Sequence, residues 1–204
     1  MMNMDVALSK AERTRQLIIE RAAPVFNQKG FAGTSMQDIM AASGLTKGGI
    51  YGHFESKEEI ALAAFEHSAG VITRMIGERV ASKESASDKL KAILQFYKTY
   101  LFSPPVQGGC PVLNTAVEAD DTNPLLRASV VKVLNRLHKA VANIVLQGIA
   151  GGEFRPEADA HRFSILFVSM IEGGVMLSKA YGDNKYLNVV ISQLEHMLVS
   201  ELQI

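Results

Sequence analysis

The sequence lacks tryptophan, has a single cysteine among its 204 residues and carries no net charge. One cysteine excludes an internal disulfide and fits a reducing compartment. The longest apolar stretch, residues 163–177, is interrupted by Glu172 and two glycines and is too short to cross a bilayer, so we expect no membrane contact. With 48% hydrophobic and 21% charged residues, the composition is that of an ordinary soluble globular protein.

Sustained alternation of apolar and polar residues is also missing, so the sequence predicts an all-α fold. The five histidines show no metal-ligand spacing with one another or with Cys110, and we expect neither a metal nor a cofactor. Residues 44–49 superficially suggest a phosphate-binding loop but lack its spacing and the preceding strand. No catalytic arrangement can be argued from the sequence, so we do not expect an enzyme.

The N-terminus contains Asp5, Lys10 and Glu12 and no apolar run, so we expect no signal peptide and a cytoplasmic protein. Residues 1–8 are expected to be disordered and have no Arg or Lys to form a minor-groove arm. Through residue 57 the chain has seven Lys and Arg against five Asp and Glu. This excess gives weak support for nucleic-acid contact.

Residues 34–57 are the most informative stretch and predict two short helices joined by a tight turn. Thr34 and Ser35 are suitable N-cap residues, and Gln37 stands three residues after Thr34, as in a capping box. Gly44 can adopt the left-handed conformation that ends a helix. The pattern predicts a helix-turn-helix, whose second helix can enter the major groove of DNA.

The second helix of this pair is expected over residues 47–53, with Thr46 as its N-cap. It contains three glycines, each costing about 1 kcal/mol relative to alanine inside a helix. A missing side chain is useful where a helix lies close against phosphates or base edges. The alternative is that the polar residues nearby are only a solvated surface. The candidate DNA-contacting residues are Thr34, Ser35, Thr46, Lys47, Gly48, Tyr51, His53 and Lys57.

This stretch resembles the TetR family of transcriptional regulators. The resemblance covers about the first quarter of the chain and rests on Gly30-Phe31, Thr34-Ser35, Asp38-Ile39, Ala42, Gly44-Leu45, Gly49-Ile50-Tyr51-Gly52-His53-Phe54 and Ser56-Lys57-Glu58. It implies that Tyr51 and Lys57 hold phosphates, while Thr46, Lys47 and Gly48 are better placed for bases. It also implies a DNA-binding domain over residues 1–56, here called the head, and an effector-binding and dimerisation domain over residues 57–204, here called the body.

Helical periodicity, caps and breaks extend the prediction along the chain. Pro24 should bend the first helix, and Phe31 and Phe54 are expected in the small core of the head. Further helices are predicted over residues 9–29, 57–82, 88–102, 112–119, 123–150, 157–181 and 185–202.

The last two predicted helices are apolar on more than one face, which calls for a second packing partner. Packing against the same pair from another subunit would make a four-helix bundle, the dimer interface usual in TetR proteins. Gly173 and Gly174 would let the backbones approach closely there. Two-fold symmetry would in turn make the DNA target a palindrome.

Cys110 lies in a Gly-Gly-Cys-Pro loop ahead of a predicted helix, where exposed amide groups could lower the pKa of its thiol. Residues 109–118 are similar to a segment of TetR relatives that include the N-ethylmaleimide-responsive repressors, in which the matching cysteine senses electrophiles or oxidants. The alternative is a buried structural cysteine. By family resemblance, the effector pocket lies between the fourth and eighth helices. Its candidate lining residues, each of which could instead be plain core, are Phe96, Tyr100, Asn114, His138 and Met170.

The sequence therefore predicts a homodimeric DNA-binding regulator, most simply a repressor released from a palindromic operator in double-stranded DNA. Release would come from a small, mostly apolar or electrophilic effector, or from modification of Cys110. The alternative is a small-molecule-binding or structural helical dimer that no longer binds DNA.

Overall fold

The computed structural model describes residues 9–100 and 102–204, and the predictions for residues 1–8 lie outside this range. The predicted all-α fold is confirmed: the described residues form helices and no strand, apart from one isolated bridge between Phe154 and Gln203. The elements are α1 (Lys10–Gly33), α2 (Met36–Ser43), α3 (Lys47–Tyr51), α4 (Lys57–Ala81), α5 (Ala86–Lys98), α6 (Pro111–Ala119), α7 (Pro124–Ala150), α8 (Ala160–Tyr181), α9 (Lys185–Met197) and a π-helical turn η1 (Leu198–Leu202).

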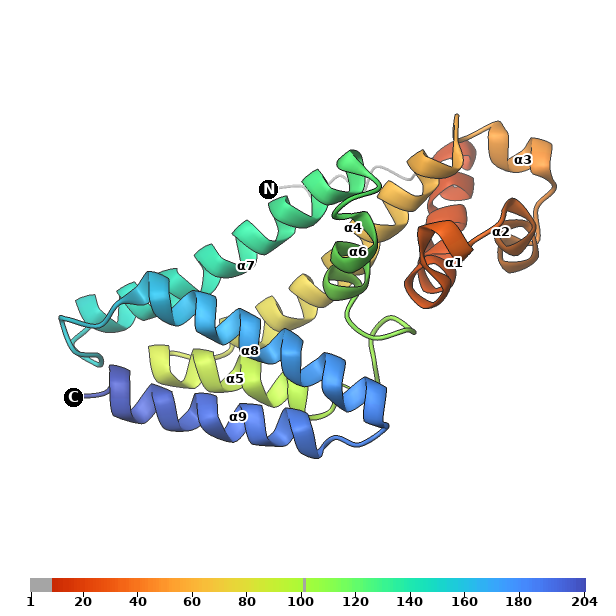
Figure 1. Ribbon diagram of the computed structural model, residues 1–204. Helices are drawn as coiled ribbons and strands as arrows, with labels where there is room; N and C mark the ends of the chain where they lie inside the picture. Colours follow the sequence, from red (N-terminus) through yellow and green to blue (C-terminus); the bar gives the residue numbers. More distant parts are fainter. Residues whose placement is uncertain (1–8, 101) are drawn as a thin grey trace.

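The head lies at one end of the molecule, with α2 and α3 projecting beyond α1 (Figure 1). Its core joins α1, α2, α3 and the start of α4 through the buried residues Ile18, Ala22, Ile39, Ile50, Phe54 and Ile60. The prediction that Phe31 shares this core is wrong, because Phe31 packs against the larger core of the body. Gly30 has a φ of 74°, which breaks α1 one turn before its end, near the predicted stop.

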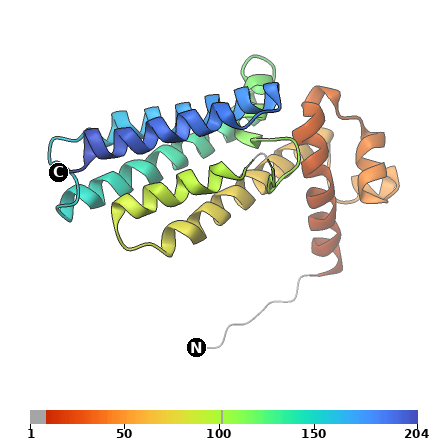
Figure 2. The ribbon, with the colours of Figure 1, turned by 90° about the horizontal axis from the view of Figure 1, so that it is seen from below.

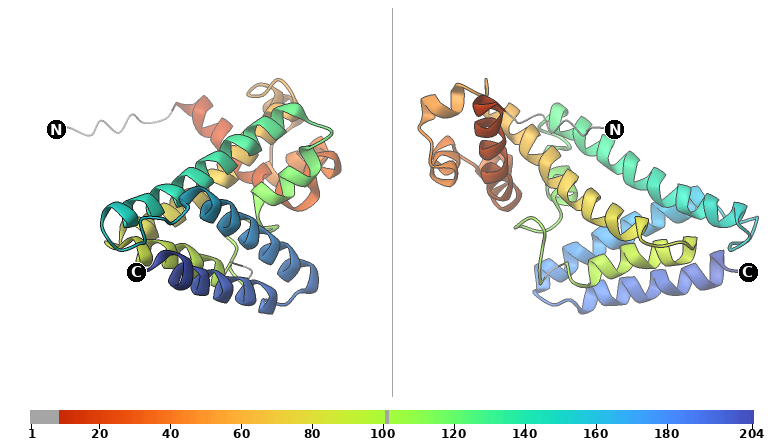
Figure 3. Two further views of the ribbon diagram at one scale, coloured as in Figure 1. Left: turned by 60° about the vertical axis from the view of Figure 1, so that its left-hand side comes forward. Right: turned by 180° about the vertical axis from the view of Figure 1, so that it is seen from behind.

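The body is a bundle in which α8 packs against both α7 and α9, and α5 packs against α4, α7 and α9. Figures 2 and 3 show this bundle extending away from the head, with the C-terminus at the far end. Helix α4 packs against α1 in the head and against α5 and α7 in the body, so it connects the two parts directly. The predicted boundary at residue 56 falls on the N-cap of α4 and stays a prediction.

Several predicted helix ends shift in the structure. The capping box of α2 pairs Ser35 with Asp38, because Thr34 faces inward as the C-cap of α1. Helix α5 ends at Lys98 rather than residue 102, and α8 begins only after Asp159, whose carboxylate caps it. These ends depend on which of several adjacent cap residues the packing favours.

Helix α8 is long and apolar enough to cross a membrane by length and composition, which corrects the estimate from residues 163–177 alone. In the fold it is a core helix held between α7 and α9. Gly174 contacts Leu187 and Val190 of α9 in the same chain, so its close approach serves packing within the subunit. Gly173 faces open space.

Candidate functional site

The N-terminal half of α3 is an exposed helical surface of the head. Thr46 accepts a hydrogen bond from the Gly49 N–H at 3.2 Å and so caps the helix, as predicted. A Cβ built on Gly48 would meet nothing within 4 Å. Glycine at position 48 is therefore not required by any contact inside the chain, although it lowers helix propensity. The side-chain-free surface faces outward, beside the exposed Lys47.

Tyr51 and His53 lie at the other end of α3. The Tyr51 side chain is 40% exposed, and the Lys47 ammonium lies 5.8 Å from the centre of its ring. His53 is half-buried, and its carbonyl oxygen accepts a hydrogen bond from Arg15 Nη1 at 2.7 Å. The structure thus brings Thr46, Lys47, Gly48 and Tyr51 together on one short exposed helix.

Arg15 on α1 is a positioning residue that the sequence prediction missed. Besides the bond to His53, its Nη2 donates to Glu59 Oε1 at 2.9 Å, and its guanidinium lies 3.9 Å from the centre of the Phe54 ring. A guanidinium can make all three contacts at once because it is planar and carries several donors. Arg15 therefore ties the end of α3 to α4. These contacts span 38 and 44 residues, so helical periodicity gives no signal of them.

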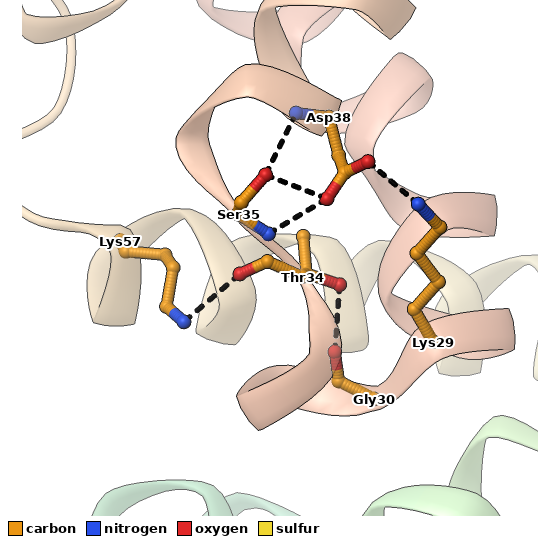
Figure 4. Close-up of polar contacts among 6 residues, drawn as sticks. All are labelled: Lys29, Gly30, Thr34, Ser35, Asp38 and Lys57. Atoms are coloured by element: carbon orange, nitrogen blue, oxygen red, sulfur yellow. Dashed lines mark hydrogen bonds and ion pairs between the residues drawn. The ribbon is translucent and has the colours of Figure 1, made fainter.

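Lys57 and Thr34 hold the connection between α1 and α2 (Figure 4). Lys57 Nζ donates to the carbonyl oxygens of Phe31 at 2.9 Å and Thr34 at 3.0 Å, which leaves one of its three N–H donors for a phosphate. The Thr34 side chain is buried, and its hydroxyl donates to the Gly30 carbonyl at 2.6 Å. This burial corrects the prediction for Thr34, whose side chain is a structural element of the head.

Ser35 lies in the capping box that opens α2 (Figure 4). Its backbone N–H and hydroxyl both donate to Asp38 Oδ2, and Lys29 Nζ lies 2.6 Å from Asp38 Oδ1. The hydrogen bond from Lys29 and those from Ser35 hold the pKa of Asp38 well below its usual range. Ser35 itself remains exposed, so it stays a candidate contact.

Helix α6 links the body to the head through two polar side chains. Glu118 accepts hydrogen bonds from the backbone N–H groups of Phe31 at 2.7 Å and Ala32 at 2.8 Å. Asn114 Nδ2 donates to the carbonyl and side-chain oxygens of Asn27, both at 3.0 Å. A displacement of α6 would therefore act directly on the end of α1.

Cys110 is the N-cap residue of α6 and is buried. Burial raises the pKa of its thiol well above the usual value, as does the neighbouring Glu172, and the amide groups of α6 only partly oppose this. The prediction of a lowered thiol pKa is therefore wrong. The thiol lies 3.2 Å from Glu172 Oε1, and burial raises the pKa of that carboxyl to about 7.

The predicted effector residues do not form one site. Phe96 and Tyr100 are buried with ring centres 5.6 Å apart, whereas Asn114 lies at the junction of α6 with the head. His138 on α7 has a buried Nδ1 with no hydrogen-bond partner among the described residues, and Met170 packs against the body core.

An apolar cavity of about 60 Å³ does lie between α4, α5, α7 and α8, but none of the five predicted residues lines it. Its lining includes Ile76, Tyr97, Val141, Phe167 and Glu172. The sequence feature that could have marked Glu172 as a site residue is that it interrupts an otherwise apolar stretch. Across the part of the chain that is described, no group of three His, Cys, Asp or Glu side chains could hold a metal ion.

Comparison with known proteins relates the head and the body to the same family. Residues 18–64 match the family model for bacterial regulatory proteins of the tetR family, and residues 86–194 match the model for the tetracyclin repressor-like C-terminal domain. A TetR transcriptional regulator from Chloroflexus aurantiacus superposes with a TM-score of 0.92 at 41% identity, covering 97% of this chain and 100% of that one. A TetR-family regulator from Cytophaga hutchinsonii gives 0.89 at 36%, with coverages of 97% and 98%. Among curated relatives, the transcriptional repressor DhaR of a Mycobacterium species is 24% identical over 88% of this chain and 91% of its own.

More distant structures share the fold alone. Reduced Escherichia coli NemR is 17% identical with a TM-score of 0.78, so the similarity of residues 109–118 to the N-ethylmaleimide-responsive subgroup stays a prediction. A CifR variant, 19% identical with the same TM-score, was solved with 26-base-pair operator DNA.

Proposed function

This chain belongs to the TetR family of DNA-binding transcriptional regulators, and we propose that it is a homodimeric repressor that a small-molecule effector releases from a palindromic operator. Its named relatives include a transcriptional repressor, which favours repression. The proposal places the protein in the cytoplasm, without catalysis, cofactor or metal.

The observation that carries the proposal is the open surface at Gly48. A short helix that is capped by Thr46 and anchored by Arg15 has a defined position, yet its exposed first turn bears no side chain at position 48. Such a surface can approach base edges or phosphates closely. Exposed Thr46 and Lys47, which directly precede Gly48, supply hydroxyl and ammonium donors. We propose Thr46, Lys47 and Gly48 for bases, and Ser35, Tyr51, His53 and the free donor of Lys57 for phosphates.

Dimerisation is supported by apolar side chains left on the outer faces of α8 and α9. Val189 is 69% exposed and Met176 is 48% exposed, although both lie on helices whose inner faces are fully packed. Other exposed apolar residues on these two helices are Ile165, Leu177 and Tyr181. Exposed apolar side chains on two neighbouring helices favour a partner, and a symmetric pair would present two α3 helices to a palindrome.

Two physical routes connect the body with the head. Helix α4 contributes Ile76 to the body cavity and begins at Lys57, which holds the α1–α2 connection. Helix α6 has Cys110 as its N-cap, beside Glu172, and contacts the head through Glu118. An effector that favours one position of these helices would change the spacing of the two heads, and it must favour the non-binding state by its own differential affinity.

The test is fluorescence anisotropy with duplexes selected by the protein from random DNA. We expect a palindromic consensus and an affinity that falls steeply as salt rises, because cationic side chains displace counterions from phosphates. Absence of a consensus, together with salt-independent binding, would instead support a helical dimer that has lost DNA binding.

A further inference from the structure

Glu172 is a buried carboxylate that the chain leaves only partly satisfied. Its Oε1 lies 3.2 Å from the Cys110 thiol, which is a weak donor. Its Oε2 is buried and has no hydrogen-bond partner anywhere in residues 9–100 and 102–204. A buried charge without compensating donors is costly. The Oε2 atom is therefore a free acceptor for a hydrogen-bond donor or cation from outside the described chain.

The side chains around Glu172 supply no positive charge. The ionisable groups that interact with it are Cys110, Tyr97 and Tyr100. Burial raises the pKa of all three, so each remains neutral at pH 8. Burial also raises the pKa of Glu172 to about 7, so its carboxylate is mostly ionised at that pH. The result is a negative charge in an apolar setting without a positively charged partner.

Glu172 also lines the cavity between α4, α5, α7 and α8, where the other walls are almost entirely apolar. Tyr97, an aromatic residue, lines the same cavity and interacts with Glu172. A carboxylate beside an aromatic ring is a favourable environment for an organic cation, because both the charge and the ring face attract it. The apolar walls suit a hydrocarbon body.

We propose that this cavity binds the ammonium group of a small organic amine, with the Glu172 carboxylate as its counter-ion and Tyr97 beside it. The inference rests on the proposed function, because it names the chemical class of the effector.

Because the cavity is small, binding of an amine would displace the helices that line it. Its volume of about 60 Å³ is far below the roughly 300–1,000 Å³ of typical ligand pockets. The ammonium end therefore fits, and a larger body enters only if the helices that line the cavity, α4 among them, move apart. Since α4 begins at Lys57 and its first turn packs in the core of the head, a bound amine would favour a different position of the head.

The experiment titrates benzylamine, benzyl alcohol and toluene into the full-length protein at pH 8 and follows binding by calorimetry. We expect benzylamine to bind at least tenfold more tightly than benzyl alcohol. Glu172→Gln should remove this preference, whereas Glu157→Gln, which changes an exposed carboxylate, should retain it. Equal binding of benzylamine and benzyl alcohol would overturn the proposal, as would full retention of the preference in Glu172→Gln.

A second arm uses only the wild-type protein, in case the variant does not fold. At pH 6, about one unit below the pKa of Glu172, most of the carboxylate is protonated, so benzylamine should bind roughly tenfold more weakly than at pH 8. An unchanged affinity would overturn the proposal. DNA affinity is measured on the same samples without amine, so loss of amine binding with intact operator binding refutes the inference alone.

Discussion

The Glu118 carboxylate on α6 accepts a hydrogen bond from the Phe31 backbone N–H at 2.7 Å, and thereby joins the body to the end of the first helix of the head. Its second oxygen accepts from the Ala32 N–H at 2.8 Å. Both donors follow Gly30, where α1 breaks and its backbone groups lose their helical partners. One carboxylate therefore both caps the broken helix and fixes the position of α6 against it.

Glu118→Gln should loosen this junction, because an amide has one accepting oxygen where the carboxylate has two. One backbone N–H would lose its partner, at a cost of about 1–3 kcal/mol. We expect faster hydrogen exchange at Phe31 and Ala32 by NMR and a lower free energy of unfolding. Glu84→Gln, at an exposed position, is the matched control. Unchanged exchange at both amides would show that Glu118 does not hold the head.

Gly48→Ala should change stability and DNA binding in opposite directions. The new methyl group meets nothing inside the chain, and alanine is the better helix former by about 1 kcal/mol, so thermal unfolding should shift upward. The same methyl group would stand between α3 and DNA, and operator affinity should fall at least tenfold.

The control for Gly48→Ala is Gly77→Ala on α4, another exposed helical glycine where an added Cβ meets nothing within 4 Å. This variant should gain similar stability and keep its operator affinity. If Gly48→Ala also kept full affinity, α3 would not be the groove-facing helix.

Arg15→Lys should weaken operator binding by misplacing α3. Lysine keeps the charge but cannot contact His53, Glu59 and Phe54 simultaneously. Because Arg15 is about 39% exposed, the loss of stability should be modest, about 1 kcal/mol. Denaturant unfolding and anisotropy measure the two effects, and Arg13→Lys, on the same helix but exposed, should change neither. Equal operator affinities of Arg15→Lys and Arg13→Lys would show that Arg15 does not position α3.

Glu172 should make the protein less stable as pH rises from about 4.5 to about 7. Its pKa is raised in the fold, so in this window the native state binds more protons than the unfolded state, and the free energy of unfolding falls with pH. Glu172→Gln should flatten this part of the profile in urea titrations at several pH values. Glu157→Gln should leave the slope as it is in the parent. A parental slope in Glu172→Gln would mean that other groups cause it.

The sequence predicted the features that depend on neighbouring residues, such as helix caps and helix ends. Gly44 ends α2 in the left-handed conformation and Thr46 caps α3, because a steric freedom or a short-range hydrogen bond selects one residue type. Helix periodicity likewise gave the all-α fold and most helix bounds.

The parts that could not be predicted depend on contacts between residues far apart in the chain. Arg15 reaches Glu59, Glu118 reaches Phe31, and Cys110 reaches Glu172 across 44, 87 and 62 residues respectively. The sign of the Cys110 pKa shift was wrong for the same reason: the helix N-terminus was visible in the sequence, whereas burial and the adjacent carboxylate were not.

The most direct measurement is the affinity of the purified protein for its selected duplex as a function of salt, compared with a duplex in which one half-site is scrambled. We predict that the logarithm of the affinity falls linearly and steeply with the logarithm of salt concentration, and that scrambling one half-site weakens binding at least tenfold. A shallow salt dependence with equal affinity for both duplexes would contradict the assignment of α3 as the reading helix of a symmetric dimer.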